Sequence, residues 1–237
     1  MGAHAGAPGP VLGVGARCRR RDAHLGACLT RSANAFARRL RRGAPELGYP
    51  QAEPIIIDEV AIRLGGGDDG YRADFRDIHA YGVSNLTVTN VRSDLDTLQF
   101  QLSFYVPRIS ARARYRSSGK LLMMQASGGG DYWGIYEGVR AKVYFRAHPV
   151  EGRDLRPHLV VDDLKMDFSV KDIRMGIENL HNGNTILQAA LNLFINTHAQ
   201  DLLKEMKPDL KRKLMVLMRS FMENLFNRIP YDAWIAE

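Results

Sequence analysis

The C-terminal quarter of the chain carries an apolar stripe with the spacing of a long helix. Apolar residues recur three or four positions apart from Leu187 to Phe226, with charged residues mostly between them, which is the period of an amphipathic helix. Pro208 interrupts the stripe, and proline disfavours helix at the residue before it. We therefore expect one long helix over residues 182–234, broken at Pro208. At about 1.5 Å per residue this rod measures roughly 60 Å, so other elements must wrap around it.

The middle of the chain, residues 55–180, alternates apolar and polar positions with a period of two. The clearest segments are residues 98–106, 132–145 and 163–170. Strands with one apolar and one polar face are typical of an antiparallel sheet that is covered on one side. Glycine-rich stretches are expected to form turns between strands, and they occupy residues 65–70, 117–120 and 128–131.

A short amphipathic helix is expected ahead of the strands. Leu29, Phe36 and Leu40 are spaced along one helical face, and Gly43 and Pro45 follow as a stop signal. A sheet with one apolar face followed by a very long helix predicts an α+β fold in which the sheet curls around the helix. A gap left between sheet and helix would form an elongated apolar tunnel.

Charge is concentrated at the start of the chain of 237 residues. Residues 1–50 hold nine arginines and two acidic residues, and so account for the whole net charge of +7. This segment has few aromatic residues to stack on bases and matches no nucleic-acid signature, so we expect no nucleic-acid partner. No uncharged apolar run is long enough for a transmembrane helix. We expect residues 17–237 to form a single domain and residues 1–16 to be a disordered or incomplete signal segment.

The two cysteines, Cys18 and Cys28, both lie in this first segment. A metal site would need more cysteine or histidine ligands nearby, and His24 does not complete a set of four. A local disulfide of a secreted protein fits better, and two unrelated thiols remain an open alternative.

No catalytic signature was found. The sequence has no Gly-x-Ser-x-Gly elbow and no His-Glu-x-x-His helix, and its seven histidines are scattered. We therefore expect neither an enzyme nor a metal site or cofactor. Asn85 begins an Asn-Leu-Thr sequon for N-glycosylation, which applies only if the chain is secreted and Asn85 is exposed.

Several segments, taken in order, resemble the insect haemolymph juvenile hormone binding proteins and their takeout-like relatives. They are residues 18–29, 43–48, 53–57, 178–196, 207–208 and 224–232. The resemblance covers about residues 17–235, and the order and spacing of the segments together are specific.

This resemblance implies a long helix wrapped by a strongly curved antiparallel sheet, similar to one half of the lipid-binding modules of the bactericidal permeability-increasing type. It also implies a disulfide between Cys18 and Cys28, secretion, and a tunnel that holds a terpenoid or similar lipid. Two features depart from the family. We expect the signal peptide to be missing or incomplete, and Glu53 stands where the family usually has aspartate before proline.

Binding a terpenoid ester needs an apolar enclosure and one or two hydrogen-bond donors for the ester oxygens. Candidates for the apolar lining are Phe100, Phe104, Trp133, Phe168, Leu191, Phe194, Met218 and Phe221, although ordinary core residues have the same pattern. Tyr132 and Tyr136 are candidates for the polar contact, because a phenol offers a donor beside an apolar ring. Their alternation puts them on the face opposite Trp133, so only one set can point inward. Phe36 and Leu40 are candidates for a gate at the tunnel mouth, or for the apolar side of a docked helix.

We therefore expect a secreted carrier that binds juvenile hormone or a related terpenoid or lipid in an internal tunnel, without turnover. The alternative is a takeout-like signalling or interaction protein that holds a structural lipid and acts through its surface on a receptor or membrane. The expected partner is a hydrophobic small molecule, terpenoid or fatty-acid-like. We expect no stable membrane insertion and a monomeric protein.

Overall fold

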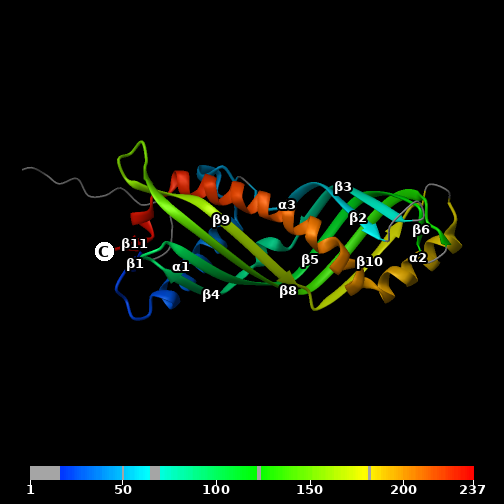
Figure 1. Ribbon diagram of the computed structural model, residues 1–237, viewed down its shortest axis with the longest axis horizontal. Helices are drawn as coiled ribbons and strands as arrows, with labels where there is room; N and C mark the ends of the chain where they lie inside the picture. Colours follow the sequence, from blue (N-terminus) through cyan, green and yellow to red (C-terminus); the bar gives the residue numbers. More distant parts are fainter. Residues whose placement is uncertain (1–16, 50, 65–69, 122–123, 181–182) are drawn as a thin grey trace, which may run out of the picture.

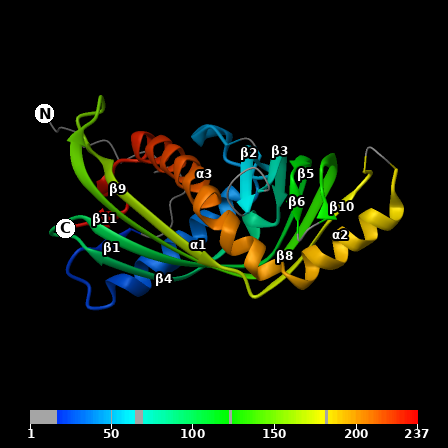
Figure 2. The ribbon, with the colours of Figure 1, turned by 45° about the vertical axis from the view of Figure 1, so that its right-hand side comes forward.

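The computed structural model describes residues 17–49, 51–64, 70–121, 124–180 and 183–237. The molecule is elongated, with the C-terminus at one end and α2 at the other (Figure 1). A seven-stranded antiparallel sheet curls along a long helix, α3, and Figure 2 shows this curvature from the side. The predicted α+β fold, a sheet curled around a long C-terminal helix, is thus confirmed. None of the helices in the described part of the chain is long and apolar enough to cross a membrane.

The elements follow one another in an order close to that expected from the sequence. They are β1 (Cys18–Arg19), α1 (Leu25–Leu40), η1 (Pro45–Leu47), β2 (Ile55–Leu64), β3 (Tyr71–Tyr81), η2 (Val83–Asn85), β4 (Thr87–Asp94), β5 (Gln99–Ser118), β6 (Lys120–Leu121), β7 (Met124–Gln125), β8 (Gly128–Glu151), β9 (Pro157–Ser169), β10 (Asp172–Glu178), α2 (Thr185–Thr197), α3 (Ala199–Arg228), η3 (Tyr231–Ala233) and β11 (Ile235–Ala236).

The two longest strands, β5 and β8, pair from Gln99–Arg146 to Ser117–Gly128 and form the spine of the sheet. In one half of the molecule β3 and β2 extend the sheet beyond β5, and β10 lies beside β8. In the other half β4 pairs with β5 and β9 pairs with β8. The sheet therefore has four edge strands, namely β2, β4, β9 and β10.

Half-way along β5 and β8, the residue positions that face the interior switch between even and odd numbers. In β5 the buried positions are even-numbered up to Val106 and odd-numbered from Ala111 onward. Opposite this point, Gly138 of β8 has a φ of +62°, a conformation that glycine adopts without strain. Both strands change phase together, because Val106 pairs with Val139 and the register continues unbroken on either side.

This change of phase corrects the sequence analysis of residues 132–145. Tyr132 is buried and Tyr136 half-buried, on the same face as Val139. Trp133 lies on the outer face, where it pairs with the exposed Arg112 of β5. The single alternation predicted for residues 132–145 does not hold across Gly138, because the inward-facing positions change there from even to odd numbers.

A second correction concerns the glycine-rich stretch at 128–131, which begins β8 and does not form a turn. Gly130 lies against the carbonyls of residues 178 and 179, and a Cβ at this position would come within 2.5 Å of the Glu178 oxygen. The glycine is therefore needed for a close backbone approach. The stretch at 117–120 does contain a left-handed glycine, Gly119, at the end of β5. Of the stretch at 65–70, residues 65–69 lie outside the described residues.

The C-terminal helix breaks at His198 and not at Pro208. α2 and α3 meet there and point in different directions (Figure 1). Pro208 lies within α3, which continues through it. A proline in a helix interior costs about 3 kcal/mol, and contacts on both sides of it offset part of that cost. Lys207 Nζ lies 2.9 Å from Asp167 of β9, and Asp209 accepts a hydrogen bond from the Ala61 N–H of β2 at 3.0 Å.

Fully buried apolar residues form two clusters at opposite ends of the molecule. The cluster near the termini includes Phe36, Leu47, Phe100, Phe145, Met222 and Ile229. The cluster near α2 includes Phe75, Tyr115, Tyr132, Met175 and Leu191. We call the stretch between them the central section. Phe104, Leu210 and Leu214 belong to neither cluster and are half-buried. Val60, Val106 and Val139 also belong to neither cluster and are buried.

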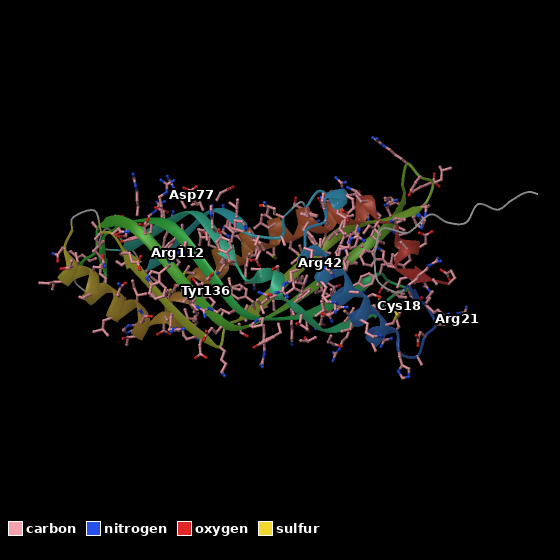
Figure 3. All side chains as sticks on the ribbon, turned by 180° about the vertical axis from the view of Figure 1, so that it is seen from behind. Cys18, Arg21, Arg42, Asp77, Arg112 and Tyr136 are labelled. Atoms are coloured by element: carbon pink, nitrogen blue, oxygen red, sulfur yellow. A yellow bond between two sulfur atoms is a disulfide. The ribbon has the colours of Figure 1, made fainter. Side chains whose placement is uncertain are left out.

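The terminal end is held together by a disulfide between Cys18 and Cys28, with an S–S distance of 2.00 Å. The predicted pairing is confirmed, and the bond is visible beside Cys18 in Figure 3. Next to it, β1 pairs with β11, so that the first described residues lie beside the C-terminus. The short helix expected over residues 29–40 is also confirmed, and begins four residues earlier, at Leu25.

Candidate functional site

Two tyrosines of β8 put polar atoms into the otherwise apolar interior near α2. The hydroxyls of Tyr132 and Tyr136 lie 2.5 Å apart, and the Tyr132 hydroxyl also lies 3.4 Å from the sulfur of Met175. Tyr136 is labelled in Figure 3, on the strand that carries both residues. Burial raises the pKa of both phenols, most strongly that of Tyr132. Both side chains are therefore neutral near pH 7 and are able to donate or accept a hydrogen bond.

Tyr115 of β5 is a third phenol in the same cluster, and its hydroxyl is unpaired. It is 4% exposed, and its oxygen has no hydrogen-bond partner among the described residues. Burial raises its pKa to about 12, so it also stays protonated. An unpaired buried hydroxyl costs about 1–3 kcal/mol, which an oxygen atom of a bound molecule would recover.

An aromatic ring joins these phenols into one group. Phe75 of β3 packs edge-on against Tyr132 with ring centres 4.9 Å apart, and its ring lies 6.4 Å from that of Tyr115. We call Tyr115, Tyr132 and Tyr136 the phenol group. Two of its three members, Tyr132 and Tyr136, are candidates already from the sequence. Tyr115 was missed, although Ala111, Ala113 and Tyr115 alternate with exposed arginines along β5.

The other predicted lining residues fall into different parts of the molecule. Leu191 and Phe194 lie with the phenol group in the cluster near α2. Phe104 and Phe168 belong to neither cluster. Phe100, Met218, Phe221, Phe36 and Leu40 lie in the cluster at the terminal end. The candidates therefore do not form one wall, and of these residues only Leu191 and Phe194 share a cluster with Tyr115 and Tyr132.

The proposed gate residues sit on a helix that is fixed at several points. Phe36 is 7% exposed and packs edge-on against Trp234, with ring centres 5.7 Å apart. α1 is tied at Cys28 by the disulfide, and the Asn34 side chain forms two hydrogen bonds to Val88 of β4. Phe36 thus contributes to the terminal core, and Leu40 packs against the same cluster.

The described residues include no group of three or more His, Cys, Asp or Glu side chains that could hold a metal ion. Of the histidines, His158 is buried and contacts an oxygen with each ring nitrogen. Its Nδ1 lies 2.7 Å from the Phe226 carbonyl oxygen and its Nε2 3.0 Å from the Asp154 carboxylate. This histidine therefore joins β9 to the end of α3.

Comparison with known proteins places this arrangement in a family. A family model described as haemolymph juvenile hormone binding protein (JHBP) matches residues 13–236, almost the entire chain. The chain belongs to this family. The resemblance expected from the sequence motifs is thereby confirmed.

Two relatives in the family, from Drosophila melanogaster and Drosophila yakuba, are described as circadian clock-controlled protein daywake. They are 26% and 25% identical to this chain over 234 residues, which cover 96% of this chain and 87% of each relative. Among solved structures, Takeout 1 of Epiphyas postvittana superposes with a TM-score of 0.81 at 18% identity, over 93% of this chain and 99% of that one. This match shows a shared fold.

Proposed function

We propose that this protein is a carrier of a hydrophobic small molecule, which lies in a tunnel between the sheet and α3 and extends from the central section to the phenol group. The unpaired, buried hydroxyl of Tyr115 is the observation that carries the proposal. It supplies a hydrogen-bond donor in an apolar surrounding, and this is what an apolar ligand with an ester or epoxide oxygen requires. Membership of a family described as juvenile hormone binding supports the same conclusion.

The ligand we propose is juvenile hormone or a related terpenoid or lipid. A long apolar chain would pack on Phe104, Leu210 and Leu214, three side chains that are only half-buried. Its oxygen would accept a hydrogen bond from Tyr115 or from the pair Tyr132 and Tyr136. The protein carries this ligand without chemical turnover and as a monomer.

We further propose that the protein is secreted. The disulfide between Cys18 and Cys28 supports this, because such bonds persist in oxidising, extracellular compartments. The description of the family as haemolymph proteins supports it as well.

A second candidate function is that of an interaction protein in which the bound lipid is structural. The two Drosophila relatives support this second function, because they are described as clock-controlled proteins and their description mentions no ligand. The two functions differ in one measurable property. A carrier exchanges its ligand, whereas a structural lipid stays bound through purification and does not exchange.

The experiment that tests the carrier compares Tyr115→Phe with Tyr231→Phe in a displacement assay with a fluorescent fatty acid and juvenile hormone as competitor. Tyr231 is a matched control, because its hydroxyl is also buried and unpaired but lies at the terminal end. We expect Tyr115→Phe to weaken juvenile hormone binding about tenfold, the loss of one hydrogen bond to a ligand, and Tyr231→Phe to leave it unchanged. Equal affinity for juvenile hormone in both variants and the wild type would show that Tyr115 is not part of the site. If juvenile hormone did not displace the fluorescent fatty acid at all, a terpenoid ligand would be rejected.

A further inference from the structure

A surface pocket of about 570 Å³ opens between α1 and the segment that joins β3 to β4. Its lining residues are Arg31, Asn34, Arg38, Arg41, Ser84, Asn85, Leu86 and Thr87. We call it the arginine pocket. Arg42, labelled in Figure 3, marks the end of α1 on this side of the molecule. The volume lies within the range of about 300–1,000 Å³ that is typical of small-molecule sites.

The three arginines line the pocket because of their spacing on α1. Arg31, Arg38 and Arg41 are separated by seven and three positions, which places them on one side of the helix. Phe36 occupies another side and is buried in the terminal core, which fixes the rotation of α1. All three arginines are exposed, so their charged groups stand around the pocket with little cost of desolvation.

None of these three arginines has a carboxylate partner among the described residues, whereas other arginines of the same region do. Arg39, on the same helix, lies 2.6 Å from Glu46, and Arg20 lies 2.7 Å from Asp96. The lining of the arginine pocket contains no acidic residue. Three positive charges therefore face one pocket without compensation from within it.

The carboxylate of Glu53 interacts electrostatically with Arg41 but is hydrogen-bonded to other groups. It accepts hydrogen bonds from the N–H groups of Gly82 and Ser84 at 2.8 and 2.7 Å. Burial acts to raise the pKa of Glu53, but these hydrogen bonds and the charge of Arg41 lower it below its usual value, so the carboxylate is ionised. Arg41 acts on this carboxylate through its charge, and the ion pairs of the described residues do not include one between the two. Glu53 orients η2, and through it the opposite wall of the pocket.

We propose that the arginine pocket binds a phosphate monoester carried on a polar, hydroxyl-bearing group, such as a phosphorylated inositol. A guanidinium group can donate two parallel hydrogen bonds to two oxygens of one phosphate. Three guanidinium groups carry three positive charges, so they suit a multiply charged phosphate ester better than a ligand with a single carboxylate. Ser84, Asn85 and Thr87 supply hydroxyl and amide groups for the rest of the ligand. The same chemistry occurs in a free inositol phosphate and in the headgroup of a phosphoinositide lipid. This site is separate from the proposed interior ligand site and does not depend on it.

The test measures binding of inositol trisphosphate by calorimetry, and of phosphatidylcholine vesicles with or without phosphatidylinositol bisphosphate by co-sedimentation. The protein is used with its disulfide intact and without a glycan on Asn85, whose side chain lines the pocket. The variant is Arg31→Gln/Arg38→Gln/Arg41→Gln. The control is Arg112→Gln/Arg116→Gln/Arg140→Gln, which removes the same charge from exposed arginines of the sheet.

We expect the wild type and the control to bind inositol trisphosphate or the phosphoinositide vesicles alike, and the pocket variant to bind at least about tenfold more weakly. Binding to inositol trisphosphate alone would identify the ligand as a free phosphate ester. Binding to the phosphoinositide vesicles alone would identify it as a lipid headgroup. Either outcome supports the site if only the pocket variant loses binding. Absence of binding by the wild type to either probe overturns the proposal. Equal losses in the two triple variants also overturn it, because they would show attraction to net charge without a site. Circular dichroism of both variants checks that the fold is kept.

Discussion

Asn192 of α2 forms two hydrogen bonds with a single residue of the sheet, Ile177. Its amide oxygen accepts from the Ile177 N–H at 2.7 Å, and its amide nitrogen donates to the Ile177 carbonyl at 2.9 Å. The side chain thus replaces the neighbouring strand that edge strand β10 lacks. Asn34 of α1 does the same for Val88 at the opposite edge, β4, at 2.9 and 2.8 Å.

The remaining two edges are covered by α3. Asp209 accepts from the Ala61 N–H of β2, and Arg219 donates to the Val161 carbonyl of β9 at 2.8 Å. Each of the four edge strands is therefore hydrogen-bonded to a helix side chain. Covered edges cannot pair with a second molecule, so this arrangement protects an open sheet from aggregation.

We predict that Asn192→Ala lowers the free energy of unfolding by about 1–3 kcal/mol, because it leaves both backbone groups of Ile177 without partners. Urea unfolding followed by circular dichroism measures the change. Asn227→Ala is the matched control, an exposed asparagine of α3, and should change stability by less than about 0.5 kcal/mol. Equal effects of the two substitutions would contradict the role of the edge contact.

Removing the disulfide should have an effect of similar size. The Cys18 to Cys28 loop spans ten residues in sequence, and a loop of that size restricts the unfolded chain by about 2–3 kcal/mol. We expect Cys18→Ser/Cys28→Ser to lower the urea midpoint accordingly while the cluster near α2 stays intact. Hydrogen exchange would show faster exchange at β1, α1 and β11. Faster exchange throughout α2 and β10 instead would argue against the separation into two cores.

Pro208→Ala is predicted to stabilise the protein. The substitution restores the N–H that can pair with the Lys204 carbonyl within α3, and alanine is about 3 kcal/mol more favourable than proline in a helix interior. Proline also restricts the unfolded chain, so part of this gain is lost when it is replaced. We expect the free energy of unfolding, measured with urea, to rise by about 1–2 kcal/mol. A decrease would mean that α3 needs the proline to reach β2 and β9.

Glu53 should make stability depend on pH in the acid range. Its pKa in the folded protein is lower than the usual 4.5, with burial opposed by hydrogen bonds from Gly82 and Ser84. The ionised Glu53 therefore contributes its full stabilisation above pH 4.5, its pKa in the unfolded chain. That stabilisation is lost as the pH falls through the lower pKa of the folded protein. We expect Glu53→Gln to flatten the decline of stability between pH 5 and 3. An unchanged pH profile would show that other carboxylates, such as Asp167 beside Lys207, govern the decline.

The periodicity of the sequence predicts most of this fold. The apolar stripe after Leu187 and the period of two before it give the curled sheet and the long helix, because each requires one covered face. The prediction from periodicity fails where the backbone changes direction or alternation although the amino-acid composition stays the same. The inward-facing positions of β8 reverse at Gly138, and α3 continues through Pro208, where local preference predicts a break, with tertiary contacts of Lys207 and Asp209 beside it.

The candidate site could be predicted only in part for a related reason. Tyr132 and Tyr136 stand out as phenols on a strand, but their inward direction depends on the turn at Gly138. Tyr115 becomes notable only through its missing hydrogen-bond partner, which no sequence pattern records. The arginines of α1 read as a solvated helix face until η2, from a distant part of the chain, forms the other side of their pocket.

The central claim is that a terpenoid-like ligand binds in the interior and exchanges. The most direct test is native mass spectrometry of the oxidised protein with and without juvenile hormone, followed by addition of a competing terpenoid and extraction of whatever is bound. We predict a one-to-one adduct that the competitor displaces. A protein that ignores terpenoids, or that keeps a phospholipid which no competitor removes, would contradict the carrier function.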